Sequence, residues 1–438
     1  MVGYIITFML IVAVIYYSYS LVNKIKIDKK YVLKILSKVF PDESFDIKNV
    51  SIERTGSIKH EDTDIVEMAF YKVDAKSNKE NTYSFELRRY NPEADIEAQE
   101  YSKFKKNAKA EDNVTESVLS GSPDAANTAT IESAQSMLQE QSKREAEDKM
   151  IRARVLQHEL GIKIARILSE RSRLIPEVFY YDIVKYCTLI EYPGTQLLKD
   201  YLLNSDEDQK QQAVNKIINE IAKIHNTFND ISVYLPPRRD MEPEDFRGLL
   251  KTGLDSLYEA RLISSQQRLE LLNEYYTIGS FLSSNYLKNI KIEGVTPYKI
   301  LVNKGNFFIN EFYSYDMAPQ LTNVVEFLKD PLIYDLELEK EAIASYYNQI
   351  NVDMDYQKFM KYYHLFSCHI LTIQLLYMKL YFKKIEEHRD EIEDEENILL
   401  NWDEKHFDML YQDAKEKWQS FEESKFFIDK LDEIINAV

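Results

Sequence analysis

Residues 292–331 read IEGVTPYKILVNKGNFFINEFYSYDMAPQLTNVVEFLKDP and predict a β-hairpin followed by a helix. A Gly-Val-Thr-Pro turn precedes an apolar strand at 300–302, a Lys-Gly-Asn turn covers 304–306, and a second strand covers 307–310. Two short strands around a glycine-containing turn are typical of a hairpin. The helix is expected to begin near Pro319. Because the rest of the chain reads mostly as helix, this isolated hairpin indicates a functional site at its tips.

The same order of motifs resembles the catalytic and metal-binding segment of aminoglycoside phosphotransferases and choline kinases, which have the protein-kinase-like fold. The family pattern runs His-Gly-Asp, Pro-x-Asn, an Ile-Leu-Val strand, a hairpin, Ile-Asp-Phe/Trp-Glu and a later Arg-Asp-Pro. The frame of that pattern is kept at Gly294, Pro297, Ile300, Leu301, Val302, Ile309, Pro319 and residues 329–331. The resemblance covers residues 45–385 apart from an insert. It implies an α+β fold of two lobes, one small and β-rich, the other large and helical.

The residues that carry the family's chemistry are different here. Glu293 stands in place of the His, Val295 in place of the catalytic Asp, and Lys299 in place of the metal-binding Asn. Asn310 replaces the second metal-holding Asp, and Asn323 replaces a structural Asp further on. Phosphoryl transfer needs a carboxylate to orient the acceptor and oxygen ligands for Mg²⁺. The resemblance therefore implies a degenerate site without catalytic residues or metal ligands.

Nearby carboxylates leave an enzyme reading open. Glu311 and Asp316, together with Glu293, are candidates for a displaced catalytic centre. An atypical small-molecule kinase that uses them is the alternative to a degenerate, inactive site.

Composition limits the functional classes. The 438-residue chain carries a net charge of -18, which argues against nucleic-acid binding because no basic excess is present to displace counterions. Ten glycines are few for a phosphate-cradling loop. The two cysteines, Cys187 and Cys368, lie far apart and indicate neither a disulfide framework nor a metal site.

The N-terminus predicts a transmembrane anchor. Residues 1–23 carry no charge, and residues 4–22 are apolar over about the 20 residues that span a bilayer. A cleaved signal peptide is the alternative, but this segment has no basic n-region and no small-x-small cleavage site. Lys24, Lys26, Lys29 and Lys30 follow, so the positive-inside rule places the remaining chain in the cytoplasm.

The resemblance implies five nucleotide contacts, two in the expected small lobe and three in the expected large lobe. Strands are expected at 45–54, 65–74 and 83–89, with Gly56 in the nucleotide loop and Arg88 matching the residue that contacts the phosphates. Glu191 and Tyr192 match the hinge that would face an adenine. An exposed edge-strand charge is the alternative for Arg88. The only candidate cofactor is ATP or another nucleotide bound without metal, with Lys299 and Arg88 in place of the cation.

The intervening segments complete the organisation. Residues 107–141 are poor in large apolar residues and predict a disordered insert. A helix is expected at 138–171, with Arg152 facing Arg88 or, after a register change, Glu147 or Glu159 doing so. His225, on a helix at 209–228, is expected to be a core or capping residue. A long apolar helix at 356–388 is expected to be buried in the core rather than in a membrane.

These expectations define four segments. They are a transmembrane anchor at 1–23, a basic helical linker at 24–44, a small lobe at 45–190 and a large lobe at 191–438. The sequence favours a single-pass, cytoplasm-facing pseudokinase that binds or scaffolds a protein partner at the membrane. A purely structural subunit of a membrane complex is a further alternative.

Overall fold

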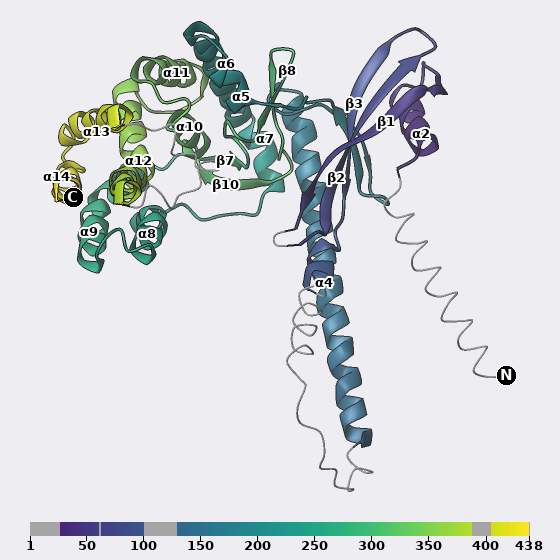
Figure 1. Ribbon diagram of the computed structural model, residues 1–438, viewed down its shortest axis with the longest axis horizontal. Helices are drawn as coiled ribbons and strands as arrows, with labels where there is room; N and C mark the ends of the chain where they lie inside the picture. The colour runs from purple at the N-terminus through teal and green to yellow at the C-terminus, as the bar shows by residue number, and fades with distance from the viewer. Residues whose placement is uncertain (1–26, 61–62, 100–128, 388–403, 438) are drawn as a thin grey trace. The chain divides into compact units, whose positions relative to one another are not determined.

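The computed structural model describes residues 27–60, 63–99, 129–387 and 404–437. The chain forms two compact units (Figure 1): Met1–Arg166 with Pro176–Tyr192, and Ile167–Ile175 with Pro193–Val438. The second division, between Tyr192 and Pro193, coincides with the expected hinge. The first unit contains a large sheet and the second is mainly helical, so the mixed α+β class is confirmed.

The first unit is built on a five-stranded antiparallel sheet of order β1-β2-β3-β5-β4. Its strands are β1 (Phe45–Lys59), β2 (Val66–Ser77), β3 (Thr82–Tyr90), β4 (Val178–Asp182) and β5 (Cys187–Glu191). Side chains alternate across the sheet, because successive residues of a strand point to opposite faces. Phe85 and Leu87 pack in one cluster with Val32 and Leu36 of helix α2 (Lys29–Val39).

Helix α4 (Ala129–Ser169) packs on the other face of the sheet (Figure 1). Its His158 ring stacks on Tyr90 of β3, with 4.3 Å between ring centroids. Tyr90 and Arg88 alternate with Leu87, so they lie on the face opposite α2. The sheet therefore has an apolar face under α2 and a face under α4 that carries charged residues.

Several expected boundaries in this unit were wrong. Gly56 does not lie in a loop, because β1 continues past Arg54 to Lys59 and Gly56 pairs with Phe70 of β2. Helix α4 begins at Ala129, so residues 129–141 are helical rather than a disordered insert. Helix α2, expected in a linker, packs against the sheet.

The remaining N-terminal expectations lie outside the described residues. They are the span at 1–23 and the part of the insert at 107–128. Among the helices in the described part of the chain, none is long and apolar enough to cross a membrane.

The second unit packs helices around two small antiparallel sheets, β7–β10 and β6-β8-β9. Its longer helices are α6 (Glu207–Asn226), α8 (Pro243–Glu259), α9 (Ser265–Ser284), α11 (Leu336–Gln349), α12 (Tyr356–Glu387), α13 (Glu404–Gln419) and α14 (Lys425–Asn436). The shorter helical segments are α5 (Leu198–Leu203), α7 (Phe228–Ile231), η1 (Ser232–Tyr234) and α10 (Thr322–Leu328). Leu365, Phe366 and Leu376 of α12 are buried, which confirms the expected core helix.

The predicted hairpin is present. Strands β8 (Ile300–Asn303) and β9 (Asn306–Ile309) pair directly, and β6 (Gln196–Leu197) joins β8. Lys304 and Gly305 have φ angles of 51° and 76°, and positive φ at both central residues is the requirement of a type I′ hairpin turn. The expected helix start was displaced: β10 (Tyr315–Pro319) pairs with β7 (Lys288–Ile292), and α10 begins only at Thr322.

Burial keeps four histidines uncharged. It lowers their pKa values to about 4 for His158, about 3 for His225, about 3 for His364 and about 4 for His369. The unfolded chain therefore binds more protons than the folded chain below a pH of about 6.5. Two carboxyl groups act in the opposite sense, because burial raises the pKa of Asp330 to about 6 and also raises that of Glu326.

We predict that the melting temperature falls as pH is lowered from 7.5 to 5.5, since four depressed histidines outweigh two raised carboxyls. His364→Phe removes one of these groups and keeps a ring beside Phe421. This variant should lose up to about 1.4 kcal/mol per pH unit of the dependence. Calorimetry at several pH values measures both slopes. A melting temperature that rises on acidification, or an unchanged slope in the variant, contradicts the prediction.

Candidate functional site

The loop between β7 and β8 forms the centre of the candidate site in the second unit. Gly294 has a φ of 81°, and a Cβ placed there would lie 3.6 Å from Lys299 Cβ and 3.5 Å from Glu311 Cβ. The amides of Lys299 and Ile300 both donate to the carbonyl of Thr296, which closes the loop into a tight turn. A glycine is thus needed at position 294 because the backbone there has a positive φ. This conformation explains why the chain has the Gly of the family pattern at this position.

Val295 follows Gly294 and is buried, with 2% of its surface exposed. At the position that the sequence pattern matches to the family's catalytic carboxylate, the chain therefore packs an apolar side chain into the core. Glu293, in the place of the family's His, is exposed, and its amide donates to the carbonyl of Ser314.

Lys299 and Glu311 form an ion pair with 2.8 Å between Nζ and Oε2. The amide of Asn310 donates to the carbonyl of Lys299 at 3.3 Å, so the structure brings Lys299, Asn310 and Glu311 together. The side chains of Lys299 and Glu311 are 48% and 28% exposed. The cation at the expected metal position is therefore paired by a carboxylate of the chain and remains reachable from solvent.

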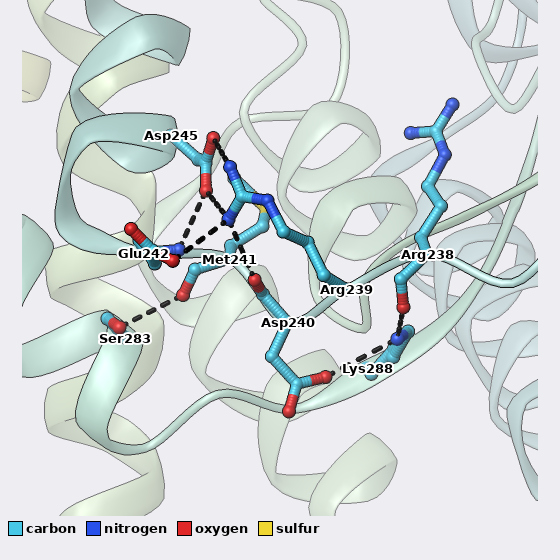
Figure 2. A network of polar contacts seen from close by, with 8 residues as sticks. All are labelled: Arg238, Arg239, Asp240, Met241, Glu242, Asp245, Ser283 and Lys288. Carbon is cyan, nitrogen blue, oxygen red and sulfur yellow. Dashed lines mark hydrogen bonds and ion pairs between the residues drawn. The ribbon is translucent and has the colours of Figure 1, made fainter.

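Asp316, the other displaced carboxylate, lies on β10 and forms an ion pair with Arg238. Arg238 comes from the segment between η1 and α8. Lys288 of β7 donates to the Arg238 carbonyl and also lies 3.3 Å from Asp240 (Figure 2). Since β7 pairs with β10, these contacts tie the segment to the ribbon that carries Asp316.

The same segment is fixed at its other end by Arg239. Its guanidinium binds both carboxylate oxygens of Asp245 at 2.6 and 2.9 Å, and Asp245 also accepts the Glu242 amide at the start of α8. Ser283 of α9 donates to the Met241 carbonyl (Figure 2). The bond from Arg239 holds the pKa of Asp245 below its usual range. Arg238 thus projects from a braced segment.

The side chain of Asn323 holds the backbone of Ile292, directly before the loop. Its amide oxygen accepts the Ile292 N–H at 2.9 Å and its amide nitrogen donates to the Ile292 carbonyl at 2.8 Å. A carboxylate could accept the first of these bonds but could not donate the second. The Asn in place of the family's structural Asp is thus matched to this backbone, which ends directly before Glu293.

Arg88 of β3, in the first unit, is paired within its own strand. Its Nε lies 2.6 Å from Glu86 Oε1, and the two side chains are only 3% and 8% exposed. The Phe70 ring lies 5.1 Å from the guanidinium carbon. Arg88 is therefore not an exposed edge charge, because it is buried with a carboxylate two residues away.

The expected facing of Arg88 by Arg152 was wrong. Arg152 is exposed on α4, and the α4 residue beside Arg88 is His158, whose pKa the Arg88 charge helps to lower. Neither of the proposed substitutes takes this place: Glu147 pairs with Lys143, and Glu159 acts on Tyr181. The sequence predicted a helix start at residue 138, whereas the helix begins at Ala129. The expected bounds did not identify which of its residues face the sheet.

The other predicted nucleotide contacts of the first unit are Glu191, Tyr192 and Gly56. Glu191 ends β5, where its amide donates to the Glu177 carbonyl at 2.9 Å. Tyr192 follows, and the ammonium of Lys72 lies 5.1 Å from its ring centroid. Gly56 lies inside β1 with no positive φ, so it gives no sign of a phosphate-binding loop. Of the five predicted contacts, Lys299 belongs to the second unit and the other four to the first.

His225 is a core residue, as expected. It is buried, its Nδ1 lies 2.6 Å from the Tyr346 hydroxyl, and its carbonyl accepts the Asn289 side chain. In the described part of the chain, no three His, Cys, Asp or Glu side chains gather closely enough to hold a metal ion.

Comparison with known proteins returns the family that residues 292–331 resemble. No family model and no curated protein sequence matches the chain. Similar solved structures include a choline/ethanolamine kinase family protein from Mesorhizobium loti, with 9% identity, a TM-score of 0.39 and coverage of 87% of this chain and 92% of that one. A macrolide 2'-phosphotransferase from Brachybacterium faecium has 9% identity, a TM-score of 0.42 and coverage of 83% and 99%. A choline kinase from Cryptosporidium parvum has 11% identity, a TM-score of 0.41 and coverage of 94% and 97%.

We predict that Glu86→Gln destabilises the first unit by about 3 kcal/mol, because it removes the carboxylate that pairs with the buried Arg88 charge at 2.6 Å. Asp74→Asn is the matched control on the same sheet, since Asp74 pairs with Lys72 at 3.3 Å and both side chains are about a third exposed or more. It should cost less than about 1 kcal/mol. Denaturant unfolding compares the two variants, and equal losses would show that the Arg88 pair has no special weight.

Proposed function

We propose that this protein is a membrane-anchored, cytoplasm-facing pseudokinase of the aminoglycoside-phosphotransferase type that acts as a binding or scaffolding module. The observation that carries the proposal is the Lys299–Glu311 ion pair beside buried Val295. Lys299 and Asn310 stand at the positions where catalysis needs metal-binding oxygens, Glu311 pairs with the Lys299 charge, and a valine stands at the position of the acceptor-orienting carboxylate.

The charges around the proposed site are matched by the chain itself. Glu311 pairs with Lys299, and Asp316 pairs with Arg238. Glu311 and Asp316 could orient an acceptor only by leaving their partners, which disfavours an atypical small-molecule kinase that uses either of them. A nucleotide bound without metal would have to compete with Glu311 for the half-exposed Lys299.

A protein partner fits this proposal better than a purely structural subunit. The element order of a kinase-like chain is retained, and the loop at residues 293–299 is held by specific backbone bonds rather than lost. A fold whose loop is closed, with Glu311 and Asp316 paired, is suited to presenting a fixed surface. The anchor at residues 1–23 would place that surface at the cytoplasmic side of a membrane.

The first test restores the missing ligands. Lys299→Asn with Asn310→Asp, alone and together with Val295→Asp, should make nucleotide binding depend on Mg²⁺. The affinity for ADP should rise at least about tenfold with the metal, which corresponds to about 1.4 kcal/mol. The double variant is included because Val295 is buried and its replacement by Asp costs stability.

Titration calorimetry with and without Mg²⁺ measures this gain. Lys304→Asn with Asn306→Asp makes the same kinds of exchange in the hairpin turn and should change nothing. If the folded double and triple variants gain no more than this control, the assignment of Lys299 and Asn310 to the metal positions is wrong.

The second test concerns topology. A reporter fused after Val438 should behave as cytoplasmic in intact cells, because the lysines that follow residue 23 hold the chain inside. Removal of residues 1–26 should release a folded soluble protein, since it spares Asp28, whose side chain accepts the Tyr31 amide at 2.7 Å and caps α2. Access to the C-terminal reporter from outside the cell would refute the topology.

A further inference from the structure

The outer side of α2 and the β4–β5 turn form one surface that the proposed site does not use. We define the α2/turn surface by Lys34, Lys38, Ile183, Val184 and Lys185. Ile183 and Val184 sit at the tip of the turn and are 62% and 80% exposed. Lys34 and Lys185 are exposed as well. Two large aliphatic side chains therefore project into solvent among lysines, at a turn where polar residues are more usual.

Specific contacts join the turn to the helix. The Tyr31 hydroxyl donates to Asp182 at 2.9 Å, and the ammonium of Lys185 lies 4.0 Å from the Tyr31 ring centroid. Further along α2, Lys38 donates to the Tyr180 hydroxyl at 3.0 Å. These contacts hold the lysines of α2 and the aliphatic tip of the turn in fixed positions relative to each other.

The acidic groups on this surface are engaged by the chain. Asp182 accepts the Tyr31 hydroxyl and the amides of Val184 and Lys185, and these bonds outweigh its burial and hold its pKa below the usual range. Asp28 accepts the Tyr31 amide. Glu159 of α4 acts on neighbouring Tyr181 from the other side of the sheet. The exposed charge is thus mainly that of the lysines.

This charge is opposite to that of the whole chain. The net charge is -18, yet residues 24–38 contain six lysines and one aspartate. An acidic protein is repelled by an anionic bilayer unless it turns a basic surface toward it. Each lysine close to such a bilayer adds favourable energy, and exposed aliphatic tips insert among headgroups.

The chain length also limits where this surface can lie. The apolar segment ends at Val22 and α2 begins at Lys29, and seven extended residues reach at most about 25 Å. A span at residues 4–22 would therefore tether the α2/turn surface within reach of the headgroups.

We propose that the α2/turn surface docks the first unit onto an anionic lipid bilayer, with Ile183 and Val184 inserted at headgroup depth. This inference rests on the proposed membrane anchor and adds a second, peripheral contact that fixes the orientation of the sheet unit.

The test places an environment-sensitive NBD dye at the tip by Val184→Cys in the full-length protein reconstituted into vesicles. The native Cys187 and Cys368 are buried, and burial raises both thiol pKa values, so labelling is selective. Leu156→Cys is the matched control: Leu156 is 65% exposed in the same unit, on the helix that serves the opposite face of the sheet. Vesicles contain phosphatidylcholine alone or with phosphatidylserine.

With phosphatidylserine, spin-labelled lipids should quench the dye at 184 and not at 156. Lys34→Gln and Lys185→Gln should each lower the ratio of docked to undocked protein by about fivefold. Absence of quenching at 184 while the protein remains in the vesicles overturns the docking surface and leaves the anchor intact. Equal quenching at both positions also overturns it, because no defined face then meets the bilayer. Failure of the protein to stay with the vesicles would instead refute the anchor, and with it the tether argument.

Discussion

The ion pair between Lys299 and Glu311 is the interaction on which the functional interpretation depends. Its two side chains flank Gly294, whose positive φ allows the loop to close, and buried Val295 completes the turn. A lysine at this place repels a divalent cation, and the neighbouring carboxylate is already committed to it. The loop is closed by its own backbone bonds while the two charges cancel, and the proposal of a binding role rather than phosphoryl transfer rests on this pairing.

The rest of the second unit holds that loop in place. Asn323 fixes the end of β7, and Arg238 pairs with Asp316 of β10. The segment that carries Arg238 is braced by Arg239 (Figure 2). In the first unit, Arg88 is likewise paired with Glu86 under α4. The same kind of local charge matching thus occurs in both units, and it would keep each folded without a bound nucleotide or metal.

The sequence predicted the parts of this structure that local chemistry determines. The hairpin followed from Gly305 between two apolar strands. The hinge expected at Glu191 and Tyr192 lies where the chain divides into its two units. The Glu86 pair could have been found, because residues two apart on a strand share a face. The partner of Asp316 could not, since Arg238 lies 78 residues away and no local pattern links them. The start of α4 was missed because a shortage of core-forming residues was taken as disorder, although Ala, Glu, Gln and Met favour a helix.

The basic helix α2 follows the apolar N-terminal segment and also forms part of the sheet unit's core through Val32 and Leu36. The proposed anchor would therefore be joined directly to an element that the first unit needs in order to fold. The most direct test of the central claim is phosphoryl transfer by the unmodified full-length protein. Consumption of ATP with and without Mg²⁺ should be indistinguishable from a buffer control, for aminoglycosides, choline-like alcohols and protein acceptors alike. Mg²⁺-dependent turnover that disappears on Glu311→Ala or Asp316→Ala would contradict the account and establish a kinase with displaced carboxylates.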